Sequence, residues 1–275
     1  MLEIGAGTGL VSICAAQVGR KVYATDIDCV DPGASPSTEN ESDRGNGNDS
    51  LGILELLACN CRDNLDNESR VSVRVLDLTD ESFPLFHVGF ALSHAALTYE
   101  ELPAQKSSFS FRKEDLQLFA SECTILLGAD IIYLDHVTFH LVRRLPILLL
   151  KKRAPNPELK DQSPARKKHK TSPIPLWESR TLYLAFERRI HFVKDDYRIT
   201  APAWDFFLRT VEAINLDLSG RIGDDGTDLA DAFPAVQIAL QQIELGEMPH
   251  CFEYERVKEL ELWKVFLMFE ESKKS

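Results

Sequence analysis

The hydrophobic and polar positions in the first eighty residues alternate between two periods. Leu2 and Ile4 are typical of the end of a strand, whereas residues 10–18 carry an apolar stripe at helical spacing. Residues 21–25 (KVYAT) predict a second strand. A further helical pattern and a strand with alternating valines follow at residues 53–61 and 71–75. The pattern therefore predicts strands that alternate with helices.

The same alternation continues in the second half of the chain. Residues 123–130 (CTILLGAD) form a continuous apolar run, which is typical of a parallel strand buried on both faces. Helical spacing follows over residues 137–148, residues 181–187 (TLYLAFE) predict another strand, and residues 204–214 predict a helix. Repeated strand–helix units favour the α/β class, with a doubly wound and mostly parallel sheet.

The C-terminal part predicts an antiparallel edge for this sheet. Residues 235–245 and 252–257 are strand-like segments, and we expect them to pair as a hairpin through the connection GEMPH. The segment ELELWKVFLMF at 259–269 is compatible with either a strand or a helix. The hairpin is expected to close the sheet.

The length of the chain fits one elaborated domain over residues 1–275, since 275 residues can bury a full core. Residues 29–50 hold almost no apolar side chain, and residues 151–176 are basic and rich in proline. Both segments are expected to be disordered insertions, because they cannot bury enough surface to offset the entropy of ordering. The first strand is so short that we expect the sequence to begin inside a larger domain, without its N-terminal region.

The composition changes the expected partners. The net charge is −12 and the pI is about 5.1, which disfavours direct binding of nucleic acid and suits a basic, lysine-bearing protein segment. None of the six cysteines forms a C-x-x-C pair, so reduced thiols in an intracellular protein are expected, without a metal. His136 and His140 are more typical of a helix face than of a metal site. No apolar run is long enough to span a membrane.

Two basic groups, at residues 151–153 and 166–170, are separated by a polar spacer. This arrangement is similar to a bipartite nuclear import signal, and it is equally typical of a charged, flexible loop. Both interpretations remain open. The expected localisation is the nucleus, the cytoplasm or both.

The strongest chemical signal is a glycine-rich segment at the start of the chain. Its residues are Glu3, Ile4, Gly5, Ala6, Gly7, Thr8 and Gly9. Alternating glycines permit a tight turn between a strand and a helix and let a ligand lie against the main chain. A dinucleotide fingerprint requires G-x-G-x-x-G, and Leu10 stands where its third glycine would be. The spacing with a preceding acid instead resembles motif I of class I methyltransferases.

Acidic residues end the predicted strands that follow. Asp26 ends the second strand, where a carboxylate can accept both hydroxyls of a ribose; a helix cap or a turn is the simpler alternative. Asp77 ends the third strand and is a weaker candidate for the exocyclic amine of adenine. These residues, with Glu3 and residues 5–9, are the predicted cofactor-binding set.

The fourth predicted strand ends in Asp130, followed by Ile131, Ile132 and Tyr133. The carboxyl end of such a strand lies beside the crevice of a doubly wound sheet, where a reacting group is held. A carboxylate there can orient an amine, and a tyrosine face can attract a cation. Asp130 and Tyr133 are therefore the predicted catalytic residues. A methyltransferase of planar amides or adenine amines typically has an Asn-Pro-Pro-Tyr segment at this place. Isoleucines stand in the middle of the segment here, so that substrate class is disfavoured.

Together these motifs resemble the family-16 protein methyltransferases, the seven-β-strand protein-lysine methyltransferase group. The matching segments are LEIGAGTGL at 2–10, VYATDID at 22–28, LDL at 76–78, D-x-x-Y at 130–133 and ERVKELELWKV at 255–265. The resemblance implies a Rossmann-like fold with a seven-stranded sheet, S-adenosyl-L-methionine as cofactor, and methyl transfer to a lysine of a protein substrate. Two alternatives remain, namely a non-catalytic interaction protein with the same fold and a methyltransferase of another substrate class.

Overall fold

The computed structural model describes residues 1–28, 52–80, 107–153, 177–193, 198–220, 236–249 and 257–269. The described elements begin with three strands and two helices in alternation. In chain order they are β1 (Leu2–Ile4), α1 (Leu10–Val18), β2 (Val22–Asp26), α2 (Ile53–Asn64), the short 3₁₀ helix η1 (Glu68–Arg70) and β3 (Val71–Val75). The alternation expected from the hydrophobic pattern of this part is confirmed.

The second half continues with helices and strands around the same sheet. Its elements are α4 (Lys113–Glu122), β4 (Ile125–Ala129), α5 (Asp135–Leu149), β5 (Leu150–Lys152), β6 (Trp177–Ser179), β7 (Thr181–Glu187), β8 (His191–Val193), β9 (Arg198–Thr200), α6 (Pro202–Gly220), β10 (Val236–Ile243), the 3₁₀ helix η4 (Leu245–Glu247) and β11 (Leu260–Phe269). Two strand pairs, β5 with β6 and β8 with β9, stand apart from the main sheet.

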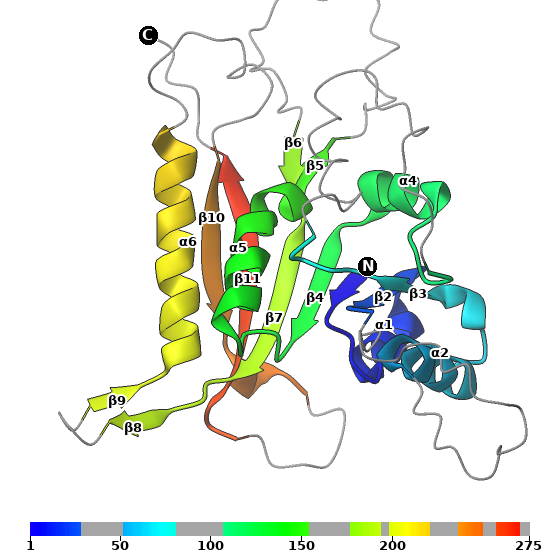
Figure 1. Ribbon diagram of the computed structural model, residues 1–275, viewed down its shortest axis with the longest axis horizontal. Coiled ribbons are helices and arrows are strands. Elements are labelled where there is room, and N and C mark those ends of the chain that lie inside the picture. The colour runs from blue at the N-terminus through cyan, green and yellow to red at the C-terminus, as the bar shows by residue number, and fades with distance from the viewer. Residues whose placement is uncertain are drawn as a thin grey trace, which may run out of the picture.

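The main sheet has seven strands in the order β10-β11-β7-β4-β1-β2-β3 (Figure 1). The five adjacent strands β7, β4, β1, β2 and β3 run parallel, while β11 is antiparallel to both β7 and β10. The chain first builds outward from β1 to β3 and then crosses to β4 and onward in the opposite direction. This is a doubly wound α/β fold with a switch point between β1 and β4, so the predicted fold class is confirmed.

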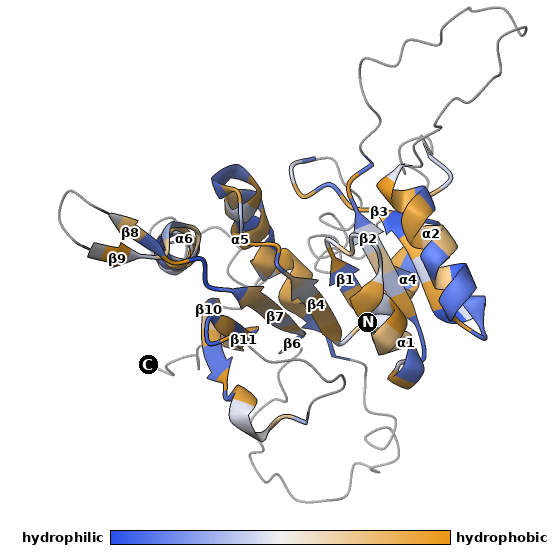
Figure 2. Ribbon diagram, turned by 90° about the horizontal axis from the view of Figure 1, so that it is seen from below, coloured by the Kyte–Doolittle hydropathy of each residue, from blue (hydrophilic) through white to orange (hydrophobic). Residues whose placement is uncertain are grey.

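Two hydrophobic clusters cover the opposite faces of the sheet. On β2, Tyr23 belongs to the cluster that packs against α4, α5 and α6, while Val22 and Ala24 belong to the cluster beneath α1 and α2. Figure 2 shows α5 and α6 on the same side of β4 and β7. Alternate residues of the same strand therefore supply the two cores.

The short strand β1 lies at the centre of the sheet. Its residues pair with β2 on one side and with β4 on the other, and Leu2 and Ile4 are buried. Central pairing stabilises three residues that would be marginal at an edge. The turn that follows β1 is consequently anchored between the two halves of the sheet.

The C-terminal hairpin is built from different segments than the sequence pattern suggested. β10 pairs with β11, which is the ambiguous segment near the end of the chain, from Val236 opposite Phe269 to Ile243 opposite Leu262. Residues 252–256 lie outside the described residues. The antiparallel hairpin was predicted correctly, but its second strand was assigned too early. The reason is that both faces of β11 carry apolar side chains, such as the buried Val265 and the exposed Met268, so its sequence shows no clear period of two.

The first basic group begins in regular structure. Lys151 and Lys152, placed by the sequence analysis in the second insertion, belong to β5, which pairs with β6. Lys151 is buried, and its Nζ lies 3.2 Å from Oε1 of Glu178. Most of the predicted insertions, at residues 29–50 and 154–176, lies outside the described residues.

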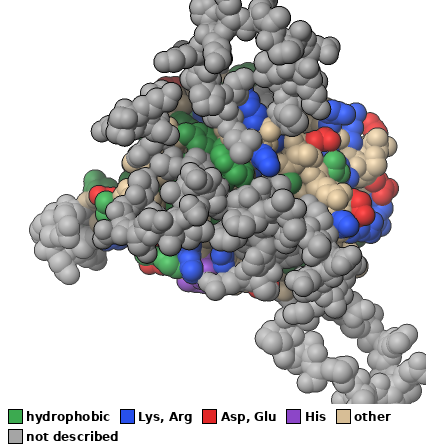
Figure 3. Space-filling model, turned by 90° about the horizontal axis from the view of Figure 1, so that it is seen from above, with side chains coloured by type: hydrophobic (Ala, Val, Ile, Leu, Met, Phe, Trp, Pro, Cys, Tyr) green, Lys and Arg blue, Asp and Glu red, His purple; other side chains and the backbone are tan. Residues whose placement is uncertain are grey.

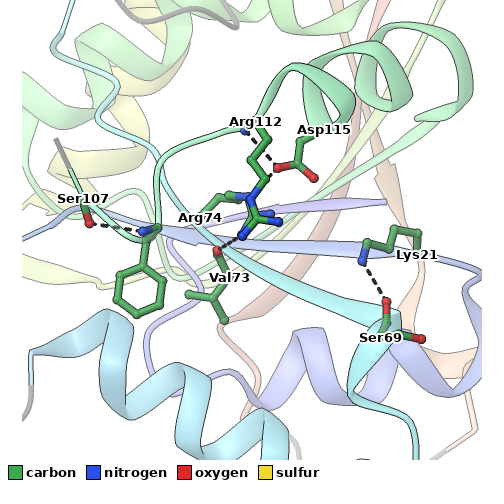
Figure 4. A network of polar contacts seen from close by, with 8 residues as sticks. Lys21, Ser69, Val73, Arg74, Ser107, Arg112 and Asp115 are labelled. Carbon is green, nitrogen blue, oxygen red and sulfur yellow. Dashed lines mark hydrogen bonds and ion pairs between the residues drawn. The ribbon is translucent and has the colours of Figure 1, made fainter. Parts of the chain in front are cut away.

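A buried ion pair joins β3 to α4 (Figure 4). Nε of Arg74 lies 2.6 Å from Oδ2 of Asp115, and the same carboxylate oxygen accepts the backbone N–H of Arg112 at the start of α4. Arg74 also donates to the carbonyl of Val73. Because both charges have hydrogen-bond partners, the pair fixes where α4 sits on the sheet.

Seen from the amino-terminal edge of the strands, charges of both signs gather toward the β3 end of the molecule (Figure 3).

Arg180 is a fully buried cation that holds helix ends together. It precedes β7, and its guanidinium lies 4.2 Å from the ring centroid of Phe119. The carbonyl oxygens that accept its hydrogen bonds belong to Phe119, Ala120, Cys123, Leu148 and Leu150. Burial lowers the pKa of Arg180 to about 10, and the group stays charged at neutral pH. One side chain thereby satisfies the last carbonyls of α4 and α5, which have no partner inside their own helices.

We expect Arg180→Met to lower the free energy of unfolding by about 3 kcal/mol, because it leaves several buried carbonyls without a donor. Arg180→Lys should lose a similar amount, since an ammonium group cannot reproduce the planar fork. Chemical denaturation of both variants measures this, with the exposed Arg62→Met as control. Unfolding midpoints equal to that of the wild type would contradict the role of Arg180.

Candidate functional site

The parallel strands end at one edge of the sheet, at the bottom of Figure 1, and the predicted site residues gather there. The glycine turn follows β1, Asp26 ends β2, and residues 130–133 follow β4. Ala6 N donates to the carbonyl of Thr25 at 2.8 Å, which holds the turn against the end of β2. Three segments far apart in the sequence therefore meet at the switch point of the sheet.

All three glycines of the turn have positive φ angles, namely 67° at Gly5, 52° at Gly7 and 95° at Gly9. A Cβ at Gly5 would lie 2.7 Å from Cγ2 of Ile131, and one at Gly9 would lie 2.5 Å from Cδ1 of Leu57. A side chain at either position would strain the backbone and would force the neighbouring Ile131 or Leu57 side chain to shift. At Gly7 an added Cβ would meet no atom within 4 Å. The turn thus presents its main chain to open space at its midpoint.

Asp26 is bonded directly to the glycine turn. Its Oδ2 accepts the backbone N–H of Gly7 at 2.7 Å, and its Oδ1 accepts the N–H of Ile27 at 2.8 Å. The predicted proximity of the second strand tip and the turn is therefore present in the structure. A charged carboxylate on an amide N–H is a strong hydrogen bond, and it fixes both groups for any ligand that lies beside them.

Asp77 lies beside the end of β2, since Leu76 N donates to the carbonyl of Asp26 at 2.8 Å. One oxygen of Asp77, Oδ1, accepts both the N–H and the hydroxyl of Thr79, at 2.8 and 2.6 Å. These bonds shape the turn after β3. Asp77 is consequently a neighbour of Asp26 at the same edge, with part of its carboxylate committed to the local turn.

Glu3, predicted among the cofactor-binding residues, points toward α1. Its side chain is 1% exposed, and its Oε2 accepts a short hydrogen bond from the hydroxyl of Ser12. Burial raises the pKa of Glu3 from about 4.5 to about 7, and the charge of Asp26 adds to this shift, while the hydrogen bonds with Ser12 oppose it. The structure therefore places Glu3 beneath the turn, where it ties β1 to α1.

Asn60 also contacts the turn, and the sequence analysis missed it. Its Nδ2 on α2 donates to the carbonyl of Thr8 at 2.9 Å. Asn60 lies in the middle of a helical pattern, more than fifty residues from the turn, so no local signal identifies it. α2 therefore supports the turn through this amide as well as through the contact of Leu57 with Gly9.

The segment after β4 combines an acidic residue of positive φ with two buried isoleucines. Asp130 has a φ of 52°, which only Asn, Asp and Gly adopt readily, and its N–H donates to the carbonyl of Ala185 on β7 at 2.8 Å. Ile131 and Ile132 are buried, and Ile131 lies against Gly5. The side chain of Tyr133 is half exposed. The isoleucines thus fasten the segment beside the turn while the acid and the phenol face outward.

Asp130 has a cationic partner outside the predicted catalytic and cofactor-binding residues. Nη2 of Arg189, two residues beyond β7, lies 2.8 Å from Oδ2 of Asp130. Because β4 and β7 are adjacent and parallel, their ends bring Asp130 and Arg189 together.

Large exposed apolar side chains border the same edge. Each follows one of the strand ends or the glycine turn: Leu10, Ile27, Tyr133 and Leu134. Exposed apolar side chains near convergent polar groups are typical of a ligand site. Within the described ranges, no three His, Cys, Asp or Glu residues converge as metal ligands. Of the helices that the structure describes, none has the length and apolar character needed to cross a membrane.

Comparison with curated proteins finds two relatives with the same name. Methyltransferase-like protein 22 of Mus musculus is 23% identical over 266 residues, which cover 96% of this chain and 48% of that protein. Its Homo sapiens counterpart is 24% identical over 265 residues, which cover 96% and 47%. This chain is similar to methyltransferase-like protein 22. It spans about half the length of these curated relatives, and no family model matches it.

The similarity to methyltransferase-like protein 22 confirms the resemblance derived from the motifs, because it extends over nearly the whole chain. Among solved structures, a precorrin-6y C5,15-methyltransferase from Geobacter metallireducens covers 97% of this chain, with 79% of its own chain covered. The TM-score is 0.31 and the identity is 11%. The strand order of this chain by itself defines its doubly wound α/β fold.

We expect the buried carboxyl of Glu3 to make stability depend on pH. Its raised pKa means that folding favours the protonated form, so the contribution is complete below about pH 4.5 and is lost as the pH rises through about 7. As the pH rises between these values, the free energy of unfolding of Glu3→Gln should therefore increase relative to that of the wild type, by up to about 3 kcal/mol. Urea denaturation at several pH values measures the difference. The exposed Glu55→Gln is the control, and parallel pH profiles for wild type and Glu3→Gln would refute the assignment.

Proposed function

We propose that this chain is the catalytic domain of an S-adenosyl-L-methionine-dependent methyltransferase that modifies a lysine side chain of a protein. The observation that carries the proposal is the hydrogen bond between Gly7 of the turn and Asp26 at the next strand tip. It joins a main chain open to a ligand with a carboxylate suited to a ribose. The similarity to methyltransferase-like protein 22 supports methyl transfer as the reaction.

The residues at the turn fit this cofactor in three respects. The space at Gly7 allows a ligand to approach the backbone, and the N-terminus of α1 begins at Leu10 without an acidic residue in its first turn. Asp26 and Asp77 supply carboxylates at neighbouring strand ends for hydroxyl and amine groups. The exposed side chain of Ile27, next to Asp26 in the sequence, supplies apolar surface. We assign the binding role to residues 5–9, Asp26 and Asp77, with Glu3 supporting the turn.

When bound, S-adenosyl-L-methionine supplies an electrophilic methyl group on a sulfonium. Residues 5–9, Asp26 and Asp77 would hold this group so that its methyl could pass to a lysine amine, whose proton would leave to solvent. Asp130 would orient the lysine amine, and the exposed ring of Tyr133 would border the approach. Positioning is the main requirement of such a displacement, because holding the two reactants in line lowers the entropic part of the activation barrier. The net charge of −12 favours a basic substrate segment.

We expect Asp26→Ala to weaken binding of S-adenosylhomocysteine at least tenfold, because it removes hydrogen bonds to a charged acceptor and releases the turn. Isothermal titration calorimetry measures the affinity. Asp66→Ala, an exposed acid before η1, is the control. An unchanged dissociation constant for Asp26→Ala would remove this residue from the site.

We expect Asp130→Asn to lower methyl transfer about a hundredfold while the affinity for S-adenosylhomocysteine stays within a factor of two. Asparagine tolerates the positive φ at this position, so the change removes the charge without adding backbone strain. The assay follows radiolabelled methyl groups into a protein extract and identifies the modified lysine by mass spectrometry. Asp135→Asn serves as control, and full turnover by Asp130→Asn would exclude the proposed role.

A further inference from the structure

The carboxylate of Asp130 already holds a cation that belongs to the chain itself. Nη2 of Arg189 lies 2.8 Å from Oδ2 of Asp130, and the two side chains are 56% and 53% exposed. A guanidinium group and a lysine ammonium group seek the same carboxylate oxygens. A side chain of the protein itself therefore occupies the carboxylate that would orient a substrate amine.

Neighbouring contacts fix the backbone from which Arg189 reaches Asp130. Arg188 N donates to the carbonyl of Glu259 at 2.7 Å, and Nη2 of Arg188 lies 3.1 Å from Oε2 of Glu261. The Arg188 guanidinium also lies 5.7 Å from the ring centroid of Trp204. Arg188 is thus held toward β11 and α6, while Arg189 extends to the other side, toward the end of β4.

Trp204 makes this anchor rigid. Its ring stacks on Phe186 and Phe207 and contacts Trp263, with centroid distances of 4.7, 5.1 and 4.9 Å. Trp263 Nε1 donates to the same Glu261 oxygen that Arg188 contacts. Because this cluster is packed, Arg189 can leave Asp130 without moving the backbone of residues 187–188. Release requires only rotation of the Arg189 side chain.

The strength of the pair suits exchange. An ion pair between half-exposed side chains is weak and is screened by salt, so an incoming cation can replace it. While Arg189 is bound, the charge of Asp130 is neutralised and an approaching ammonium meets a like charge. When Arg189 leaves, the full charge of Asp130 is available to the substrate.

We propose that Arg189 is a resident competitor of the substrate lysine for Asp130, so that it sets how tightly the site accepts a cationic side chain. This inference rests on the proposed function, since it assigns the amine-orienting role to Asp130. It adds a specificity-determining residue outside the predicted motifs. A substrate must offer a cation that displaces a guanidinium, which disfavours neutral amides and hydroxyls.

The decisive variant is Arg189→Gln. We expect the KM for a lysine-bearing protein substrate to fall about three- to fivefold, the amount that an exposed ion pair contributes, while kcat stays unchanged. The exposed Arg209→Gln on α6 removes the same charge from a site away from Asp130 and should leave both constants unchanged. In an Asp130→Asn background, Arg189→Gln should give no decrease in KM. An unchanged or increased KM, or a decrease in kcat, would overturn the proposal.

A second measurement does not depend on catalysis. n-Butylammonium chloride, a mimic of the lysine side chain, is titrated at constant ionic strength while NMR follows the backbone amides of residues 130–133. We expect the apparent dissociation constant to fall about three- to fivefold in Arg189→Gln relative to the wild type. Equal titrations of the two proteins, or no response in either, would overturn the proposal. A response of the expected size without methyl transfer to lysine would instead refute the proposed function and leave the competition at Asp130 standing.

Discussion

The hydrogen bond from the Gly7 amide to the Asp26 carboxylate connects the two strand ends on which the candidate site depends. It is possible only because β1 and β2 are adjacent, parallel and in a register that brings Ile4 opposite Thr25. The positive φ angles of the glycines turn the chain back within a few residues, so the amide meets the carboxylate. Displacing the register by one residue would direct Asp26 to the other face of the sheet.

The rest of the fold keeps this small region in place from several sides. Ile131 presses on Gly5 from the segment after β4, while Leu57 presses on Gly9 from α2. Glu3 ties β1 to α1 from below through Ser12. At the opposite end of the strands, Arg180 holds the ends of α4 and α5 together, and the Arg74–Asp115 pair joins α4 to β3. Buried polar groups therefore occur where helices must keep a defined position relative to strand ends.

Burial divides the acidic residues near the site into supporting and accessible groups. Glu3 is enclosed and its pKa is raised to about 7, so part of its population is neutral at physiological pH. Asp130 is half exposed and forms an ion pair with Arg189, whose side chain is also at the surface. Both are carboxylates close to the switch point, but only the exposed one is free to exchange partners. Solvent access, more than residue type, separates a group that stabilises the turn from one that can meet a substrate.

The sequence by itself determined the strand–helix alternation, the glycine turn and the acids at the strand tips, because these depend on local period and on the φ angles that glycine permits. The position of the hairpin strand β11 was not determined, since apolar side chains on both of its faces leave no clear local period. Arg189, Asn60 and the orientation of Glu3 were decided only by tertiary structure. Each is defined by a contact across many residues of sequence, from Arg189 to Asp130, from Asn60 to Thr8 and from the sheet to α1. Such contacts arise from the order and register of the strands, which no local pattern encodes.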